Sequence, residues 1–401
     1  MSASGPTRTL RIGLVVPGFS ASEEDWCIPA LLTLVRALAQ RAEVRVFAIR
    51  WPDQCRDYGV HGATVHAFGG GAAKTWSRVA LLARALGHIV RAGRREPFDV
   101  LHGFWADEPG TLAVLAARWL GIPSVVSIMG GELVHLRDID YGAQSSPIAR
   151  LLIRTALRTA GVVTVGSTYL AELARPRVHD GRLRLLPLGV DTSMFRPASQ
   201  ADPSRSGPQQ LIHVASLTPV KNQALLLRAV RRVVDRIPDL QLHMIGDGPM
   251  RARLQESISA LALHRNVTMR GELVHHQLPD CYRDADVCVS SSRFESQAMV
   301  ALEAAACGVP SVGTAVGILP DLGAATRAVP HDEVALADAI LSLLTDEPTR
   351  RHMGREARAV VMREYRIEHT VDRLLALYTA TREAVGRHAT RGRQAVDFDV
   401  A

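Results

Sequence analysis

The residues of this sequence best placed to do chemistry are two glutamates, Glu295 and Glu303, in the segment 289–313. The segment starts as a short apolar strand, turns at residues 293–296 and continues as a helix. We expect that helix to end at Gly308, because glycine commonly caps a helix and a proline follows two residues later. Strand, turn and helix together give the two carboxylates a defined setting.

The start of this helix is suited to bind a diphosphate. Its first backbone N–H groups have no partner within the helix, and the positive end of the helix dipole lies beside them. We expect these N–H groups to belong to Ser296, Gln297, Ala298 and Met299. A carboxylate can accept hydrogen bonds from two vicinal hydroxyls, so Glu303, two turns inside the helix, suits a ribose. Glu295 would then face the group attached to the diphosphate.

The rest of the chain predicts two α/β domains in tandem. Short apolar strands alternate with amphipathic helices, which is typical of parallel sheets covered by helices on both faces. Residues 196–210, rich in Pro, Ser and Gln, are the expected linker. We predict doubly wound, Rossmann-like domains at 1–195 and 211–365 that face a cleft, because ligands bind at the carboxyl ends of such strands. A helix over 366–385 is expected to cross back to the N-terminal domain, and residues 386–401 to form a flexible tail without regular structure.

The glutamate segment resembles the retaining family 4 (group 1) glycosyltransferases, which have the GT-B fold. Their signature is a Glu, seven residues and a second Glu that opens the pattern E-A-x-A-x-G-x-P. Here the first part reads Glu295-Ser296-Gln297-Ala298-Met299, and the second part runs from Glu303 to Pro310. Two glutamates at this spacing are a weak signal alone, but the strand, turn, helix and G-x-P make it specific. The resemblance covers about residues 10–380.

The resemblance assigns roles to further residues. The stretch 214–222 looks like the strand and turn whose lysine, here Lys221, neutralises the donor diphosphate, on which charge grows as it leaves. Gly130-Gly131-Glu132 falls where the family keeps a glycine-rich turn that faces the donor. The family chemistry implies transfer with retention at the anomeric carbon. Glu295 would position or stabilise the sugar, Lys221 and the helix start would stabilise the departing diphosphate, and Glu303 would hold the ribose.

Some positions depart from the family pattern. Ser216 is a donor-site position at which the family has an arginine that partners the lysine. Met129 stands in place of a histidine before the glycine turn, and Ser296 and Ala298 in place of glycines. These departures concern donor geometry and leave the expected fold unchanged.

No metal or cofactor is expected. Two D-x-D strings, at 138–140 and 284–286, match the metal-binding string of other glycosyltransferases. The first lies in a loop with no other hard ligand nearby, and the second precedes a buried strand. His102, at the end of a strand, is expected to be structural.

The composition is that of a globular protein, with 47% hydrophobic and 22% charged residues. The five cysteines form no CxxC pair, which favours a reducing compartment, and no apolar run is long enough to span a membrane. Residues 1–195 carry 22 Lys/Arg and 16 Asp/Glu, so +6 of the net charge of +7 lies there. The basic stretch 74–95 is expected to pack on the sheet, with docking on an anionic membrane as the alternative. Without a recognised motif, nucleic-acid binding is not expected.

We therefore expect a cytoplasmic glycosyltransferase that uses a UDP- or GDP-sugar and a lipid, glycan or small-molecule acceptor. Two alternatives stay open. A nucleotide-sugar epimerase on the same fold would turn over the donor with no acceptor added. A catalytically silent module would hold a nucleotide sugar or a partner enzyme without turnover.

Overall fold

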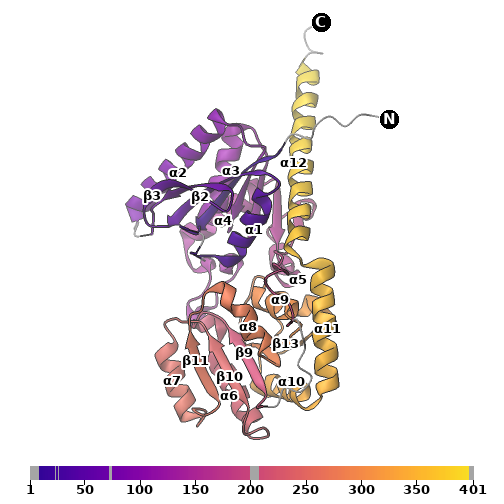
Figure 1. Cartoon of the computed structure of the whole chain (residues 1–401). Helices are drawn as coiled ribbons and strands as arrows, with labels where there is room; N and C mark the ends of the chain where they lie inside the picture. Colours follow the sequence, from indigo (N-terminus) through magenta and orange to yellow (C-terminus); the bar gives the residue numbers. More distant parts are fainter. Residues whose placement is uncertain (1–8, 23, 26, 72–74, 199–206, 397–401) are drawn as a thin grey trace, which may run out of the picture.

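The computed structural model describes residues 9–22, 24–25, 27–71, 75–198 and 207–396. Eight strands in the described N-terminal half form one sheet in the order β3-β4-β2-β1-β5-β6-β7-β8 (Figure 1). All neighbouring pairs are parallel except the β3–β4 hairpin. The strands are β1 (Arg11–Gly18), β2 (Glu43–Trp51), β3 (Cys55–Val60), β4 (Ala63–Phe68), β5 (Val100–Phe104), β6 (Ser124–Ile128), β7 (Val162–Val165) and β8 (Leu183–Leu185). The helices are α1 (Pro29–Ala39), α2 (Thr75–Arg95), α3 (Glu108–Leu120), α4 (Pro147–Thr159) and α5 (Thr168–Ala174).

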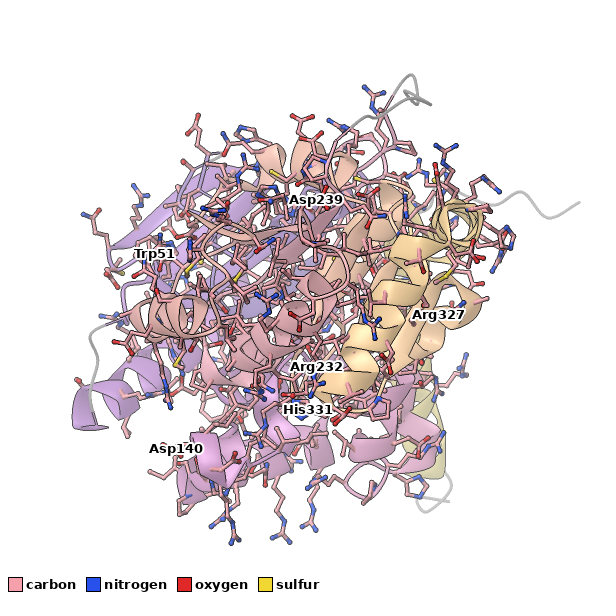
Figure 2. The ribbon with its side chains drawn as sticks, turned by 90° about the horizontal axis from the view of Figure 1, so that it is seen from below. Trp51, Asp140, Arg232, Asp239, Arg327 and His331 are labelled. Carbon is pink, nitrogen blue, oxygen red and sulfur yellow. The ribbon has the colours of Figure 1, made fainter. Side chains whose placement is uncertain are left out.

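The described C-terminal half has a six-stranded, all-parallel sheet in the order β11-β10-β9-β12-β13-β14. Its strands are β9 (Gln210–Val214), β10 (Gln241–Ile245), β11 (Val267–Gly271), β12 (Val287–Ser290), β13 (Ser311–Thr314) and β14 (Thr326–Val329). The helices that follow are α6 (Gln223–Val234), α7 (Arg251–Ala260), α8 (Leu278–Arg283), α9 (Met299–Ala306), α10 (Glu333–Thr345), α11 (Glu347–Glu364) and α12 (Ile367–Val396). Seen from below, this domain lies in front, with Trp51 and Asp140 of the N-terminal domain visible beside it (Figure 2). The predicted pair of doubly wound domains is confirmed.

The central strands of both sheets are buried on their two faces, which explains why they are nearly continuous apolar runs. In β1, Ile12 and Leu14 pack in one cluster with residues of α1 and α12, and Val15 packs in another with residues of α2 and α3. Because helices pack on both faces of the sheet, the carboxyl ends of its parallel strands are fixed in position along one edge. The glycine turn follows one of those ends, that of β6.

The last helix, α12, packs on the N-terminal domain (Figure 1). Val371 and Leu374 join the core cluster that contains β1, and the hydroxyl of Tyr378 lies 2.7 Å from His102 Nδ1. His102 Nε2 also lies 2.8 Å from the Ser127 hydroxyl, and burial lowers the pKa of His102 to about 3. A neutral, fully hydrogen-bonded imidazole in the core fits the structural role expected for His102.

Two expectations from the sequence need correction, and a third falls partly outside the described residues. The stretch from 386 was expected to lack regular structure, and this is wrong as far as Val396, where α12 ends. Alanine and arginine, frequent in this stretch, are good helix formers and extend a helix that has already nucleated. The central part of the expected linker, residues 199–206, lies outside the described residues. Helix α9 starts at Met299, two residues later than expected, and α8 lies in a stretch for which no helix or strand was predicted.

Within the residues that the structure describes, no helix is both long and apolar enough to cross a membrane. All five cysteines are free thiols.

Candidate functional site

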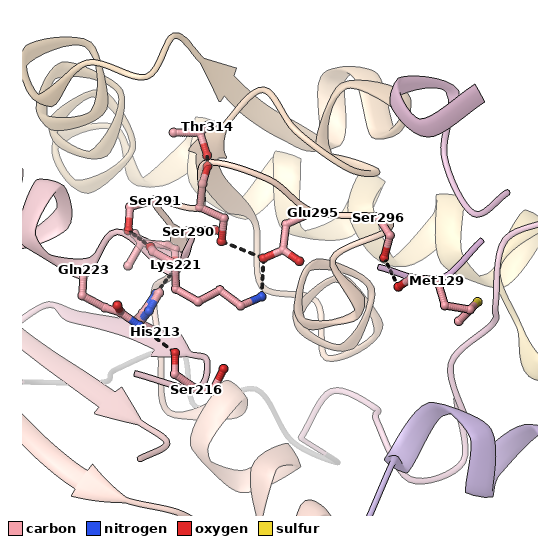
Figure 3. Close-up of polar contacts among 12 residues, drawn as sticks. Met129, His213, Ser216, Lys221, Gln223, Ser290, Ser291, Glu295, Ser296 and Thr314 are labelled. Carbon is pink, nitrogen blue, oxygen red and sulfur yellow. Dashed lines mark hydrogen bonds and ion pairs between the residues drawn. The ribbon is translucent and has the colours of Figure 1, made fainter. Parts of the chain in front are cut away.

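The core of the candidate site is an ion pair between two residues of the C-terminal domain. Lys221 ends the short 3-10 helix η5 (Pro219–Lys221) after β9, and Glu295 lies between β12 and α9. Lys221 Nζ donates to Glu295 Oε1 at 2.6 Å, and the hydroxyl of Ser292 donates to the same oxygen at 2.6 Å (Figure 3). The side chains are 22% and 12% exposed, so the pair is largely but not completely removed from solvent. The fold thus joins two of the predicted site residues that are 74 positions apart.

A buried histidine lies beneath this pair. His213 of β9 is 1% exposed, and its Nδ1 lies 2.9 Å from the carbonyl oxygen of Val289, which requires the proton on Nδ1. Burial, assisted by the positive charge of Lys221, lowers the pKa of His213 to about 4. The imidazole is therefore neutral at pH 7, so His213 adds no second positive charge near the Lys221–Glu295 pair. Sequence reasoning missed His213, because a histidine in an apolar strand looks like any core residue.

The second glutamate is held by two rings. Glu303 Oε1 lies 3.0 Å from His275 Nε2, and Glu303 Oε2 accepts a hydrogen bond of 2.9 Å from the hydroxyl of Tyr282. His275 belongs to the 3-10 helix η6 (His275–Gln277), and Tyr282 belongs to α8. Tyr282 is fully buried, which raises its pKa well above the usual range and keeps its hydroxyl a hydrogen-bond donor. The carboxylate of Glu303 is thus fixed in orientation, with further lone pairs to offer two hydroxyls.

The glycine turn of the N-terminal domain is built around Glu132. Its side chain is 2% exposed, because it folds back into its own loop. Oε1 accepts from the backbone N–H of Met129 at 3.0 Å and of Ala106 at 3.2 Å, and Oε2 accepts from Gly130 at 2.6 Å. Burial raises the pKa of Glu132 to about 7. Glu132 was expected to face the donor, but its oxygens bind backbone amides, so it shapes the turn.

The two glycines of this turn are needed for close packing. A Cβ on Gly130 would lie 2.9 Å from Trp105 Nε1, and a Cβ on Gly131 would lie 2.9 Å from the ring of Tyr141. Trp105 itself has a positive φ of 70° at the end of β5, which is uncommon for a non-glycine residue. The strained tryptophan and the two glycines together fix the backbone shape of the turn.

The loop before α9 also joins the two domains. The Ser296 hydroxyl donates to the Met129 carbonyl at 2.5 Å (Figure 3). The Ser167 hydroxyl donates to the Ser296 carbonyl at 2.6 Å. The amide of Gln297 donates to the Leu188 carbonyl at 2.6 Å and accepts from the Leu188 N–H at 2.9 Å. The side chains of two predicted diphosphate-site residues, Ser296 and Gln297, therefore fix the domains against each other.

Neighbours of these residues extend the contact. Phe294 packs between the rings of Tyr141 and Tyr169, with centroids 5.9 Å away in both cases. Arg293 Nη2 donates to Asp138 Oδ1 at 2.9 Å. The acidic string at 138–140 thus supplies an ion pair between domains, and Asp286 of the other string accepts from the backbone N–H of Gln210 at 2.8 Å.

Comparison with known proteins identifies the family. A family model described as glycosyl transferases group 1 matches residues 195–360, and one described as a glycosyl transferase 4-like domain matches residues 28–189. The chain belongs to the group 1 glycosyltransferases. It is 31% identical over 322 residues (73% of this chain, 74% of the relative) to D-inositol 3-phosphate glycosyltransferase of Thermomonospora curvata. It is 26% identical over 311 residues (72% and 77%) to N-acetyl-alpha-D-glucosaminyl L-malate synthase of Bacillus anthracis.

Solved structures show the same GT-B fold. Sucrose-phosphate synthase from Thermosynechococcus elongatus superposes with a TM-score of 0.75 at 22% identity, covering 93% of this chain and all of that one. Anabaena Alr3699/HepE in complex with UDP and glucose superposes with a TM-score of 0.72 at 17% identity, covering 92% of this chain and all of that one.

In this group 1 glycosyltransferase, the remaining predicted site residues lie as follows. Ser216 is exposed at the end of β9, where its carbonyl accepts from the side-chain amide of Gln223 at 3.0 Å. Ala298, in place of a family glycine, has a positive φ of 68° directly before α9 and keeps the backbone shape that glycine adopts freely. Met299 is the first residue of α9, so the helix start points into the same region as Glu295.

Proposed function

We propose that this group 1 glycosyltransferase transfers a sugar from a nucleoside-diphosphate donor, UDP- or GDP-linked, with retention of configuration and without a metal. The observation that carries the proposal is the pair Lys221–Glu295 at one end of the β12–α9 segment, with the ring-held Glu303 farther along α9. These groups match the three parts of such a donor. Glu303 takes the ribose, Lys221 and the α9 start take the diphosphate, and Glu295 faces the sugar.

The ion pair suggests how Lys221 responds to the donor. Without donor, Glu295 neutralises Lys221 at 2.6 Å, so no bare cation is buried. A diphosphate offers a larger negative charge, so Lys221 shifts part of its interaction from Glu295 to the phosphates. That leaves a Glu295 oxygen free to accept from a sugar hydroxyl, and Lys221 then stabilises the charge that develops on the departing diphosphate.

The acceptor is expected on the N-terminal side of the cleft. Two relatives are named for acidic compounds, D-inositol 3-phosphate and L-malate. Because the N-terminal half carries the charge excess, we propose an acceptor that bears phosphate or carboxylate. We place the reaction in the cytoplasm.

The test is calorimetric titration of UDP, GDP, ADP and TDP, followed by product analysis with the matching nucleotide sugars. Tight binding of one nucleotide and acceptor-dependent release of it support the transferase. Turnover of the donor with no acceptor indicates an epimerase, and binding without turnover indicates a silent module. Activity that disappears with EDTA and returns with a divalent cation would contradict the metal-free mechanism.

A further inference from the structure

Helix α4 has an outer face that its packing does not explain. Its inner face buries Ile153 and Leu157 in the N-terminal core. On the outside, Ile148 is 72% exposed and Leu151 is 65% exposed. These two residues are three apart and therefore neighbours on the helix surface. Large aliphatic side chains on a solvated helix face usually have a partner when they occur together.

The same face carries a cluster of arginines. A groove of about 490 Å³ lies between α4 and the turn after α5. Its lining includes Arg150, Arg154, Arg158 and Arg177 and holds no aspartate or glutamate. Among the described residues none of the four arginines forms an ion pair: Arg150 donates to the Gln144 carbonyl at 3.2 Å, and Arg177 donates to the Leu173 carbonyl at 2.8 Å.

Spacing places the arginines and the exposed aliphatic residues together. Leu151, Arg154 and Arg158 follow at intervals of three and four, so they form one stripe along α4. Arg150 flanks the stripe on one side and Ile148 on the other. The surface therefore combines uncompensated positive charge with exposed apolar side chains, which we call the α4 surface (residues 148, 150, 151, 154, 158 and 177).

Helix α2, the basic stretch 74–95 singled out in the sequence, differs from α4. Its apolar residues Leu81, Ala85 and Ile89 are buried in the cluster that joins α2 and α3. Packing on the sheet thus accounts for its amphipathic pattern, and the docking alternative raised for α2 is better supported on α4.

We propose that the α4 surface docks this protein on a membrane that contains anionic lipids. Arginine guanidinium groups bind lipid phosphates, and Ile148 and Leu151 enter the boundary between headgroups and acyl chains. A soluble polyanion would use the arginines but would leave the two aliphatic residues in water, so the lipid surface fits more of the observations.

The position of α4 determines which part of the protein would lie near the membrane. The loop before α4 places the Gln144 amide 2.5 Å from the Glu132 carbonyl of the glycine turn. A membrane bound at α4 would therefore lie beside the loop that contacts the glycine turn.

The experiment is sedimentation of the full chain with vesicles of phosphatidylcholine, with and without 30% phosphatidylglycerol, at low and high salt. We expect binding to the anionic vesicles that weakens with salt. Each basic residue near an anionic surface contributes about fivefold to binding, so Arg154→Gln/Arg158→Gln should lower the partition coefficient about 30-fold. Ile148→Ser/Leu151→Ser should also lower it at unchanged net charge. Arg91→Gln/Arg94→Gln, on the exposed side of α2, is the matched control with the same loss of charge and should bind nearly as wild type.

Failure of the wild type to bind anionic vesicles at low salt would overturn the proposal. Equal losses in the α4 and α2 arginine pairs would assign binding to net charge and overturn it as well. A third contrary outcome is binding of soluble polyphosphate that competes fully with vesicles while Ile148→Ser/Leu151→Ser has no effect on vesicle binding; the groove would then hold a soluble polyanion. Unchanged melting temperatures of all variants exclude misfolding as the cause of a loss.

Discussion

Replacement of Glu303 by glutamine is the sharpest test of the donor site, because the structure separates two roles of this carboxylate. Glu303→Ala would remove the acceptor of two donors, the buried Tyr282 hydroxyl and His275 Nε2. Each unsatisfied buried donor costs about 1–3 kcal/mol, so alanine would destabilise the fold by about 2–6 kcal/mol. Glutamine keeps the shape and one oxygen, and the Tyr282 hydroxyl can turn to accept from the new NH₂ group. We expect Glu303→Gln to cost about 1 kcal/mol in stability.

The effect of the same change on nucleotide binding should be larger. A hydrogen bond to a charged group contributes about 1.5–3 kcal/mol, against about 1 kcal/mol for a neutral one. If the ribose diol donates twice to Glu303, loss of the charge weakens binding by about 2 kcal/mol, or about 30-fold. At a ligand concentration of 100 times the wild-type Kd, stabilisation by the nucleotide would fall from about 2.7 to about 0.9 kcal/mol.

The assay is titration calorimetry with the preferred nucleotide, combined with urea unfolding with and without that nucleotide. Tyr282→Phe is the matched control, because it removes the Tyr282–Glu303 bond but keeps the carboxylate. We expect Tyr282→Phe to lose stability and to retain nucleotide binding. If Glu303→Gln binds the nucleotide as tightly as wild type, Glu303 serves only to hold the two rings, and the ribose assignment is wrong.

Three further predictions concern other residues of the site. Lys221→Met leaves Glu295 without its cation and should lower the initial transfer rate about 100-fold or more; a rate within threefold of wild type would exclude a role for Lys221 at the diphosphate. Gln297→Leu leaves the N–H and C=O of Leu188 unpaired in the domain interface and should lower the unfolding free energy in urea by about 2–4 kcal/mol; a loss below about 0.5 kcal/mol would mean that water replaces the amide. The pKa of Glu132 is raised to about 7, so between its usual pKa and 7 the folded protein holds one more proton than the unfolded chain, and stability should fall as pH rises from 5 to 7. Melting temperatures across this range should show that fall in wild type and a flatter profile in Glu132→Gln.

Much of the fold was predictable from the sequence, because the central strands of both sheets are buried and form continuous apolar runs. The strand, turn and helix expected in the segment 289–313, for example, correspond to β12 and α9, and Gly308 follows the helix end with a positive φ of 79°. The missed elements lack that signal. Strand β3 is an antiparallel edge strand with mostly exposed residues, and its sequence CRDYGV has no apolar alternation. The far end of α12 was missed because residues at the end of a helix are added to turns that have already formed. This extension requires no apolar periodicity in the sequence of those residues.

The site was predictable in its parts but not in its connections. Spacing within one strand–turn–helix unit located Glu295 and Glu303. The Lys221–Glu295 pair depends on the parallel β9–β12 pairing, which brings together residues far apart in the chain. The rings that hold Glu303 come from η6 and α8, for which no periodic pattern exists. Glu132 was misplaced for a different reason: a carboxylate after two glycines can face out or fold back, and only the backbone of the turn decides between them.

The loop 293–297 connects the Lys221–Glu295 pair to the interface between the domains. Glu295, which pairs with the diphosphate lysine, lies directly between Phe294, packed on the N-terminal domain, and Ser296, bonded to the Met129 carbonyl. A domain rotation that broke these contacts would have to move the backbone on both sides of Glu295. The geometry of the Lys221–Glu295 pair therefore depends on the interface. A ligand that binds to this pair favours the domain arrangement to which it binds more tightly, by the difference between its binding free energies for the two arrangements. Where the family has glycines, this chain has Ser296 and Ala298, so its interface gains a side-chain hydrogen bond and a less flexible backbone. Ser296 and Ala298, which depart from the family signature, thus strengthen the link between the donor site and this arrangement of the domains.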